Sequence, residues 1–168
     1  PLFFGDGSGI NHAARAVDIW ESASDANIFE SSGWMGRYLE NLHPNYPAEY
    51  PNENFPDPLA LELGNSHLSF TGRSNFTSIV TFNPEWYDEI LNPLNYSYPN
   101  TKYGEKLSYL QLIGNQANNY NKRLAEVYRN GNFNVNFPPS WFGDQLKVVA
   151  RLINAGLNTR IYSVKLGG

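Results

Sequence analysis

The stretch that most constrains the fold of this chain is residues 140–168, where a helix and a short strand are predicted in succession. Ser140 is a favourable helix N-cap, and Gly156 suits the left-handed position just past a helix end. Apolar residues recur at helical spacing between them, at Leu146, Val149, Leu152 and Ile153. The pattern predicts an amphipathic helix within residues 140–155.

Residues 159–164 are mostly β-branched or aromatic, which is typical of a short buried strand. A strand that follows a helix in this way favours a parallel sheet. We expect residues 159–164 to lie beside residues 77–82 or 59–63 in one sheet. Ligands of open α/β sheets bind beyond the carboxyl ends of the strands. The sequence ends at that point, so we expect the catalytic groups of a longer protein to follow Gly168.

Bulk composition limits the class of protein. The 168 residues are 41% hydrophobic and 15% aromatic, as in a single globular domain. The net charge is −4 and Lys and Arg do not cluster, which argues against a nucleic-acid partner. No apolar run approaches the roughly 20 residues of a membrane span. The absence of cysteine excludes disulfides, zinc–thiolate sites and cysteine nucleophiles.

Further helices and strands are predicted along the chain. The longest helix should lie within residues 102–130, with Gly131 beyond its end. Shorter helices are predicted over residues 11–23 and 33–42, and a helix start at residues 83–85. Residues 59–63 and 67–71 favour a hairpin or two adjacent strands. We expect these apolar residues to face inward: Val17, Trp20, Leu107, Leu110, Ala117, Leu124 and Val127. The helix over residues 33–42 carries Trp34, Tyr38 and Leu42.

Sequence motifs for catalysis are few. His12, His43 and His67 stand alone, without the paired spacing of a metal site. The Gly-x-Ser-x-Gly turn of serine hydrolases does not occur. Acidic pairs such as Asp18 with Glu21 share a helix face, which suits either acid/base chemistry or a solvated surface. We therefore assign no catalytic residue and no metal ligand within the sequence.

The sharpest local motif is Ser32-Gly-Trp-Met-Gly-Arg-Tyr-Leu39. Its glycines, Gly33 and Gly36, allow close approach of another backbone. The planar fork of Arg37 can bind a carboxylate, sulfate or phosphate. If Arg37 is buried, it needs a carboxylate or several carbonyl groups, and a structural role and a ligand contact both remain open. The preferred partner is Asp18, and the alternatives are Glu21 and Glu40.

Several segments occur together in the order and spacing of a known family: residues 18–24, 33–39, 59–63 and 142–168. The chain resembles the middle of the bacterial proteins of domain-of-unknown-function family 1501. These are sulfatase-like members of the alkaline-phosphatase superfamily, and many are exported by the twin-arginine route. The family usually carries Ser-His-Phe before its Asp-x-Trp element, where this chain has Asn11-His12-Ala13, one residue further from Asp18. Despite this offset from the family pattern, His12 is a ligand-binding candidate beside Arg37.

The resemblance implies a three-layer α/β/α alkaline-phosphatase-like fold, of which residues 1–168 are one partial α/β domain with a mixed sheet and covering helices. It implies periplasmic, cell-surface or secreted residence, and the rest of its own polypeptide as partner. Divalent metal ligands would lie in the parent outside this segment, which needs no cofactor of its own. We expect a metal-dependent sulfatase- or phosphatase-like parent and an inactive segment. The alternative is a non-catalytic glycan-binding or structural surface module.

Overall fold

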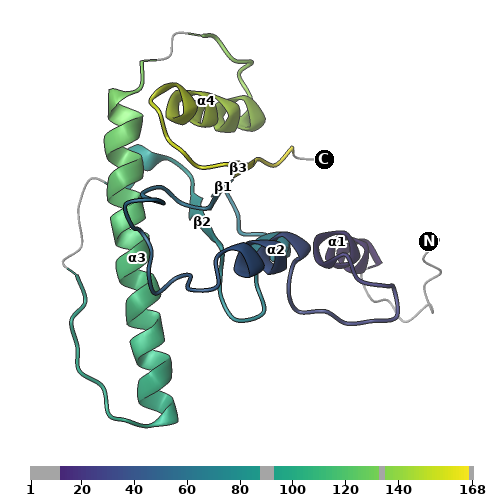
Figure 1. The fold of residues 1–168 in the computed structure, drawn as a ribbon. Helices are drawn as coiled ribbons and strands as arrows, with labels where there is room; N and C mark the ends of the chain where they lie inside the picture. The colour runs from purple at the N-terminus through teal and green to yellow at the C-terminus, as the bar shows by residue number, and fades with distance from the viewer. Residues whose placement is uncertain (1–11, 88–92, 133–134, 167–168) are drawn as a thin grey trace. The chain divides into compact units, whose positions relative to one another are not determined.

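The computed structural model describes residues 12–87, 93–132 and 135–166, and these fall into two compact units. Unit 1 comprises Pro1–Pro44 and Ser66–Ser78, and unit 2 comprises Asn45–Asn65 and Ile79–Gly168. Helices and strands follow one another in a mixed α/β order (Figure 1): α1 (His12–Ser22), α2 (Trp34–Leu42), β1 (Ala60–Leu63), the 3₁₀ turn η1 (Leu68–Phe70), β2 (Ser78–Thr81), the 3₁₀ turn η2 (Pro84–Tyr87), α3 (Lys102–Asn130), α4 (Trp141–Asn154) and β3 (Ile161–Ser163).

A small three-stranded sheet in the order β2-β1-β3 organises unit 2. Strands β1 and β3 pair in parallel, with Ala60 opposite Ile161 and Glu62 opposite Ser163. This confirms the predicted neighbour of residues 159–164 and the predicted parallel pairing. The mixed sheet that the resemblance implied is not seen in this pairing. Residues 161–164 are half-buried rather than buried, because β3 lies at the edge of the sheet while the central β1 is buried throughout.

The core of unit 2 forms where α3 and α4 pack on this sheet. It joins side chains of β1, the C-terminal half of α3 and α4, with Tyr120, Leu124 and Leu152 fully buried. Both predicted helices are confirmed, but two of the residues expected inside are not: Leu110 is 56% and Ile153 54% exposed. The core takes side chains from the C-terminal half of α3, so Leu110 in its first half lies outside the core.

Polar caps fix the starts of these two helices. The Thr101 hydroxyl accepts the Gly104 N–H at 3.1 Å, and the Ser140 hydroxyl accepts the Gly143 N–H at 3.0 Å. Past the end of α4, Gly156 takes the expected left-handed conformation, with φ of +85°. Gly131 ends α3 with φ of −72°, so a left-handed turn is not the reason for a glycine at this position. A Cβ there would lie 2.8 Å from Arg151, and close packing against α4 is the reason.

Unit 1 is built from α1, α2 and the segment 66–78. The Gly33 N–H donates to the Thr71 carbonyl at 2.6 Å. A Cβ on Gly33 would overlap the carbonyl of Leu68, and one on Gly36 would overlap the backbone of Thr71. The predicted close approach at these two glycines is confirmed.

Two other predictions for unit 1 are wrong. Residues 67–71 do not form a strand, because residues 68–70 turn as η1 while only Thr71 pairs, in a single antiparallel bridge with Phe76. The predicted inner residues of α1, Val17 and Trp20, do not face inward either. Since α2 packs through Gly36 and Leu39, its large side chains are turned outward. The exposed residues are Val17, Trp20, Trp34, Tyr38 and Leu42.

Candidate functional site

Arg37 in unit 1 is held by oxygen atoms of the backbone and of one serine. Its Nη1 donates to the Ser32 carbonyl at 2.7 Å and to the Ser32 hydroxyl at 3.3 Å, and its Nη2 donates to the Ser22 carbonyl at 2.7 Å. Ser22 is the last residue of α1, where carbonyl groups lack helical partners and the helix dipole is negative. Arg37 therefore caps the C-terminus of α1.

The predicted ion pair of Arg37 with Asp18 is wrong. The hydrogen bonds of Arg37 go to carbonyl groups and a hydroxyl, which can neutralise a guanidinium without the cost of burying a second charge. Glu30 lies nearby, and hydrogen bonds from the Ser32 hydroxyl and N–H lower the pKa of its carboxyl group, with smaller effects from Arg37 and Arg73.

Glu21 and Glu40, the alternative partners, hold backbone N–H groups of segment 66–78 instead. The Glu40 carboxylate accepts three consecutive N–H groups, those of Arg73 at 2.8 Å, Ser74 at 2.9 Å and Asn75 at 2.8 Å. The Glu21 carboxylate accepts the Leu68 N–H at 2.7 Å, where η1 begins. The two carboxylates bind this segment to α2 and α1 through donors that any residue other than proline would supply.

His12, the other ligand-binding candidate, is the first residue of α1. Its side chain lies outside the part of the chain that the structure describes, so the assignment stays a prediction. Among the described residues, no group of three or more His, Cys, Asp or Glu could hold a metal ion.

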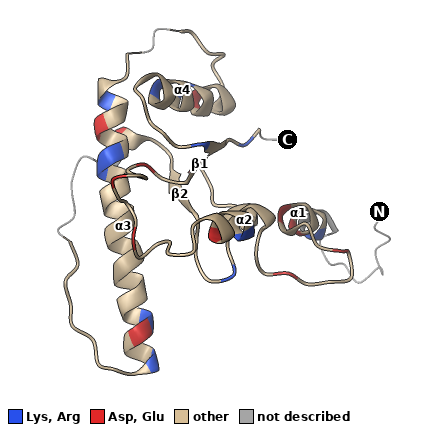
Figure 2. Ribbon diagram, in the orientation of Figure 1, with Lys and Arg blue, Asp and Glu red and all other residues tan. Residues whose placement is uncertain are grey.

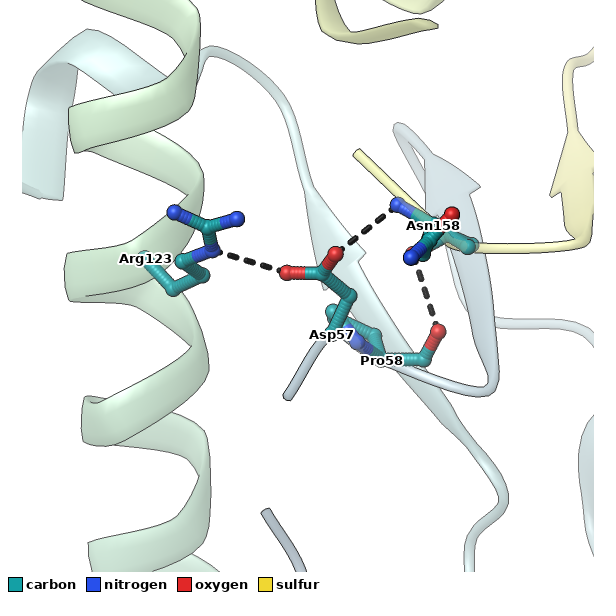
Figure 3. Close-up of polar contacts among 5 residues, drawn as sticks. Asp57, Pro58, Arg123 and Asn158 are labelled. Atoms are coloured by element: carbon teal, nitrogen blue, oxygen red, sulfur yellow. Dashed lines mark hydrogen bonds and ion pairs between the residues drawn. The ribbon is translucent and has the colours of Figure 1, made fainter. Parts of the chain in front are cut away.

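The main polar centre of unit 2 is Asp57, which sequence reasoning missed. The Asp57 side chain is 2% exposed. Its Oδ1 accepts Nε of Arg123 at 2.8 Å, and its Oδ2 accepts the Asn158 N–H at 2.8 Å (Figure 3). The Thr159 hydroxyl donates to the neighbouring Pro58 carbonyl at 2.9 Å. Asp57 thus fastens α3 and the entry to β3 onto the entry to β1.

The position of Asp57 in the sheet argues for a structural role. It precedes β1, and Asn158 precedes β3, so the centre lies at the amino ends of two parallel strands. Ligands of such sheets bind at the opposite, carboxyl edge. Figure 2 shows acidic and basic residues spread along unit 2 rather than gathered into one patch.

Several tyrosines of unit 2 have a pKa raised mainly by burial, to which the Asp57 carboxylate adds for Tyr162 and Tyr120. Burial raises the pKa of Tyr162 to about 12, and the Asp57 carboxylate adds to the effect. Burial also raises the pKa of Tyr120 and of Tyr46 above the ordinary value. These phenols remain neutral at physiological pH, so they are poor proton acceptors.

The carboxyl edge of the sheet is the remaining candidate region for a ligand site. Gly64 follows β1 with φ of +99°, and its N–H donates to the Thr81 carbonyl at 2.9 Å, so the carboxyl ends of β1 and β2 lie side by side. A Cβ on Gly64 would lie 3.1 Å from the Trp141 ring. The buried Thr81 hydroxyl has no hydrogen-bond partner among the described residues. Gln145 of α4 holds the chain after β3, donating to the Lys165 carbonyl at 3.1 Å and accepting the Lys165 N–H at 2.9 Å.

Comparison with known proteins adds no relative. The chain matches no protein-family model, no curated protein and no solved structure. Neither α3 nor any other helix within the described ranges is long and apolar enough to cross a membrane.

Proposed function

We propose that this chain belongs to the α/β/α core of an exported sulfatase- or phosphatase-like metallohydrolase of the alkaline-phosphatase superfamily. The observation that carries the proposal is the parallel pairing of β1 with β3, with α4 preceding β3 and packing on the same core. Parallel strands joined through helices are the framework of such cores. The ordered motifs of residues 18–24, 33–39, 59–63 and 142–168 support the same assignment.

The chain serves this protein as scaffold. The described residues supply no ligand set that fits a divalent metal ion, so we derive no catalytic step through a metal from them. In the proposal, the metal ligands belong to other residues of the parent polypeptide, which acts in the periplasm or at the cell surface. Arg37 positions α1 rather than a substrate, because both of its Nη atoms donate to protein oxygens.

Hydrolysis assays on two polypeptides test the proposal. The purified chain and the product of the complete gene are each given p-nitrophenyl sulfate and p-nitrophenyl phosphate with Mg²⁺, Mn²⁺, Ca²⁺ or Zn²⁺. We expect turnover by the complete product only. A complete product inactive on both esters, with every metal, would refute the hydrolase assignment. Turnover by the chain alone, removed by a substitution within residues 1–168, would refute the scaffold role.

A non-catalytic glycan-binding surface is the second candidate, and exposed aromatic rings favour it. Trp34 is 45% and Tyr38 55% exposed, and they lie one turn apart on α2. Aromatic rings at this spacing can stack on the apolar faces of sugar rings. Titration of soluble oligosaccharides against Trp fluorescence, with Trp34→Ala as the control variant, tests this function. Unchanged fluorescence at millimolar sugar would exclude it.

A further inference from the structure

Two amide side chains of α3 bind the backbone of a preceding extended segment. Asn115 donates to the Leu94 carbonyl and accepts the Leu94 N–H, both at 2.8 Å. Gln111 donates to the Tyr96 carbonyl at 3.4 Å and accepts the Tyr96 N–H at 2.8 Å. Each amide thus satisfies both backbone groups of one residue, as a neighbouring β-strand would.

The spacing of the two pairs follows from helix and strand geometry. Gln111 and Asn115 are four residues apart on α3, a rise of about 6 Å. Leu94 and Tyr96 are two residues apart in an extended chain, a rise of about 6.6 Å. The two repeats nearly match, and the segment runs antiparallel to the helix (Figure 1). A helix face with amides at this spacing can therefore bind alternate residues of any extended chain.

The side chains of Leu94 and Tyr96 remain partly exposed in this contact. Tyr96 is 65% exposed, and Leu94 is 42% exposed with only its Cδ1 close to Gly114, 3.7 Å from where a Cβ would lie. The intervening Asn95 N–H takes part in neither pair. Recognition rests on the peptide groups of residues 94 and 96.

The same arrangement occurs elsewhere in unit 2. Gln145 of α4 makes both hydrogen bonds to the backbone of Lys165, beyond the end of β3. There the Gln145 amide takes the place that a neighbouring strand would have beside Lys165. On α3 the bound segment lies outside the sheet, and residues 93–97 are exposed.

We propose that Gln111 and Asn115 form a binding site for an extended polypeptide backbone, which residues 93–98 occupy as a detachable strap. The strap is closed by four neutral hydrogen bonds, each of which contributes modestly to stability in water. The short connection to α3 keeps the strap at high local concentration, so it rebinds after each opening. Opening leaves the core residues Leu124 and Leu152 in place, because they lie in another part of unit 2.

Hydrogen exchange in the intact chain tests the proposal. We expect Asn115→Leu to speed exchange of the Leu94 amide about tenfold, and Gln111→Leu to do the same for the Tyr96 amide. Tyr96→Thr, which keeps the backbone donor, should leave the Leu94 amide protected. In wild type, exchange at residues 94 and 96 should be independent of low urea concentrations, whereas exchange at Leu124 should accelerate with urea.

Proline substitution supplies the matched control, read out as hydrogen exchange of the ladder amides that remain. Leu94→Pro removes one donor to the ladder and should speed exchange of the Tyr96 amide about tenfold, and Tyr96→Pro should do the same for the Leu94 amide. Asn95→Pro removes a donor that the ladder does not use and should change both little. Equal sensitivity at positions 94, 95 and 96 would overturn backbone recognition. Urea dependence at residues 94 and 96 equal to that of Leu124 would overturn detachment.

Discussion

Arg37 in unit 1 and Arg123 in unit 2 both have their positive charge balanced by protein oxygen atoms, but by oxygens of different kinds. Arg123 is bound by the buried carboxylate of Asp57, so opposite charges neutralise one another. Arg37 donates to the carbonyl groups of Ser22 and Ser32, so backbone dipoles take the place of a counterion. In unit 1, Glu40 shows the converse case, since its negative charge is balanced by three backbone N–H groups.

The difference has a consequence for what each centre tolerates. A carboxylate in a nonpolar surrounding needs its cation, whereas carbonyl groups at a helix end can turn to water when the cation is lost. We therefore expect unit 2 to be more sensitive than unit 1 to loss of its arginine. Of the four tryptophans, Trp20 and Trp34 lie in unit 1 and Trp86 and Trp141 in unit 2, so Trp→Phe backgrounds that keep one of them allow each unit to be followed separately.

The largest effect should follow Arg123→Met. It leaves Asp57 buried with only the Asn158 N–H, and breaking a buried pair in this way costs about 3 kcal/mol. This cost is at the low end of the range for breaking a buried ion pair, because Arg123 is 39% exposed and water can reach the pair. Urea unfolding followed at Trp141 measures the loss, and Lys122→Met on the exposed face of α3 is the control. Equal stability of the two variants would mean that the Asp57 pair contributes nothing.

A smaller loss of stability is expected for Arg37→Lys. A single ammonium group cannot reach both the Ser22 and the Ser32 carbonyl in the geometry of the guanidinium fork, so one charged hydrogen bond is lost, at about 2 kcal/mol. Unfolding followed at Trp34 tests this, with the exposed Arg73→Lys as the matched control. Unchanged stability together with loss of anion binding would instead assign Arg37 to a ligand.

The smallest effect concerns alkaline pH and unit 2 alone. The pKa of Tyr162 is raised by burial to about 12, above the value near 10 of an unfolded tyrosine. The stability that this neutral phenol contributes is fully present below pH 10 and is lost as pH rises through 12. Tyr162→Phe should therefore lose stability less steeply than wild type between pH 10 and 12 in urea titrations. A Tyr103→Phe variant, changed at an exposed ring, should follow wild type.

Sequence reasoning succeeded where the cause is local. The caps at Thr101 and Ser140 belong to helices that the apolar periodicity placed correctly, and the close approach at Gly36 follows from the absence of a side chain. It failed where the cause is a distant partner. The face that α1 buries depends on its contact with η1, so Val17 and Trp20 were assigned to the wrong side.

The polar centres were missed for a related reason. Asp57 lies between two prolines in an irregular stretch, and its partner Arg123 is far along the chain in the middle of α3. The oxygens bound to Arg37 are mainly backbone carbonyls, which every residue carries. Backbone groups that balance a charge therefore cannot be predicted from the type of residue that carries them. Pairing Arg37 by side-chain type selected Asp18 wrongly.

The amide pairs on α3 and α4 differ from both arginine centres in carrying no net charge. Salt screens exposed ion pairs, so ionic strength should have little effect on the neutral hydrogen bonds of Gln111, Asn115 and Gln145. These amides do not titrate, so the closure of residues 93–98 should be the same in acid, alkali or brine for as long as α3 itself is folded. In the proposal, the strap answers instead to another extended chain that competes for the amides of Gln111 and Asn115.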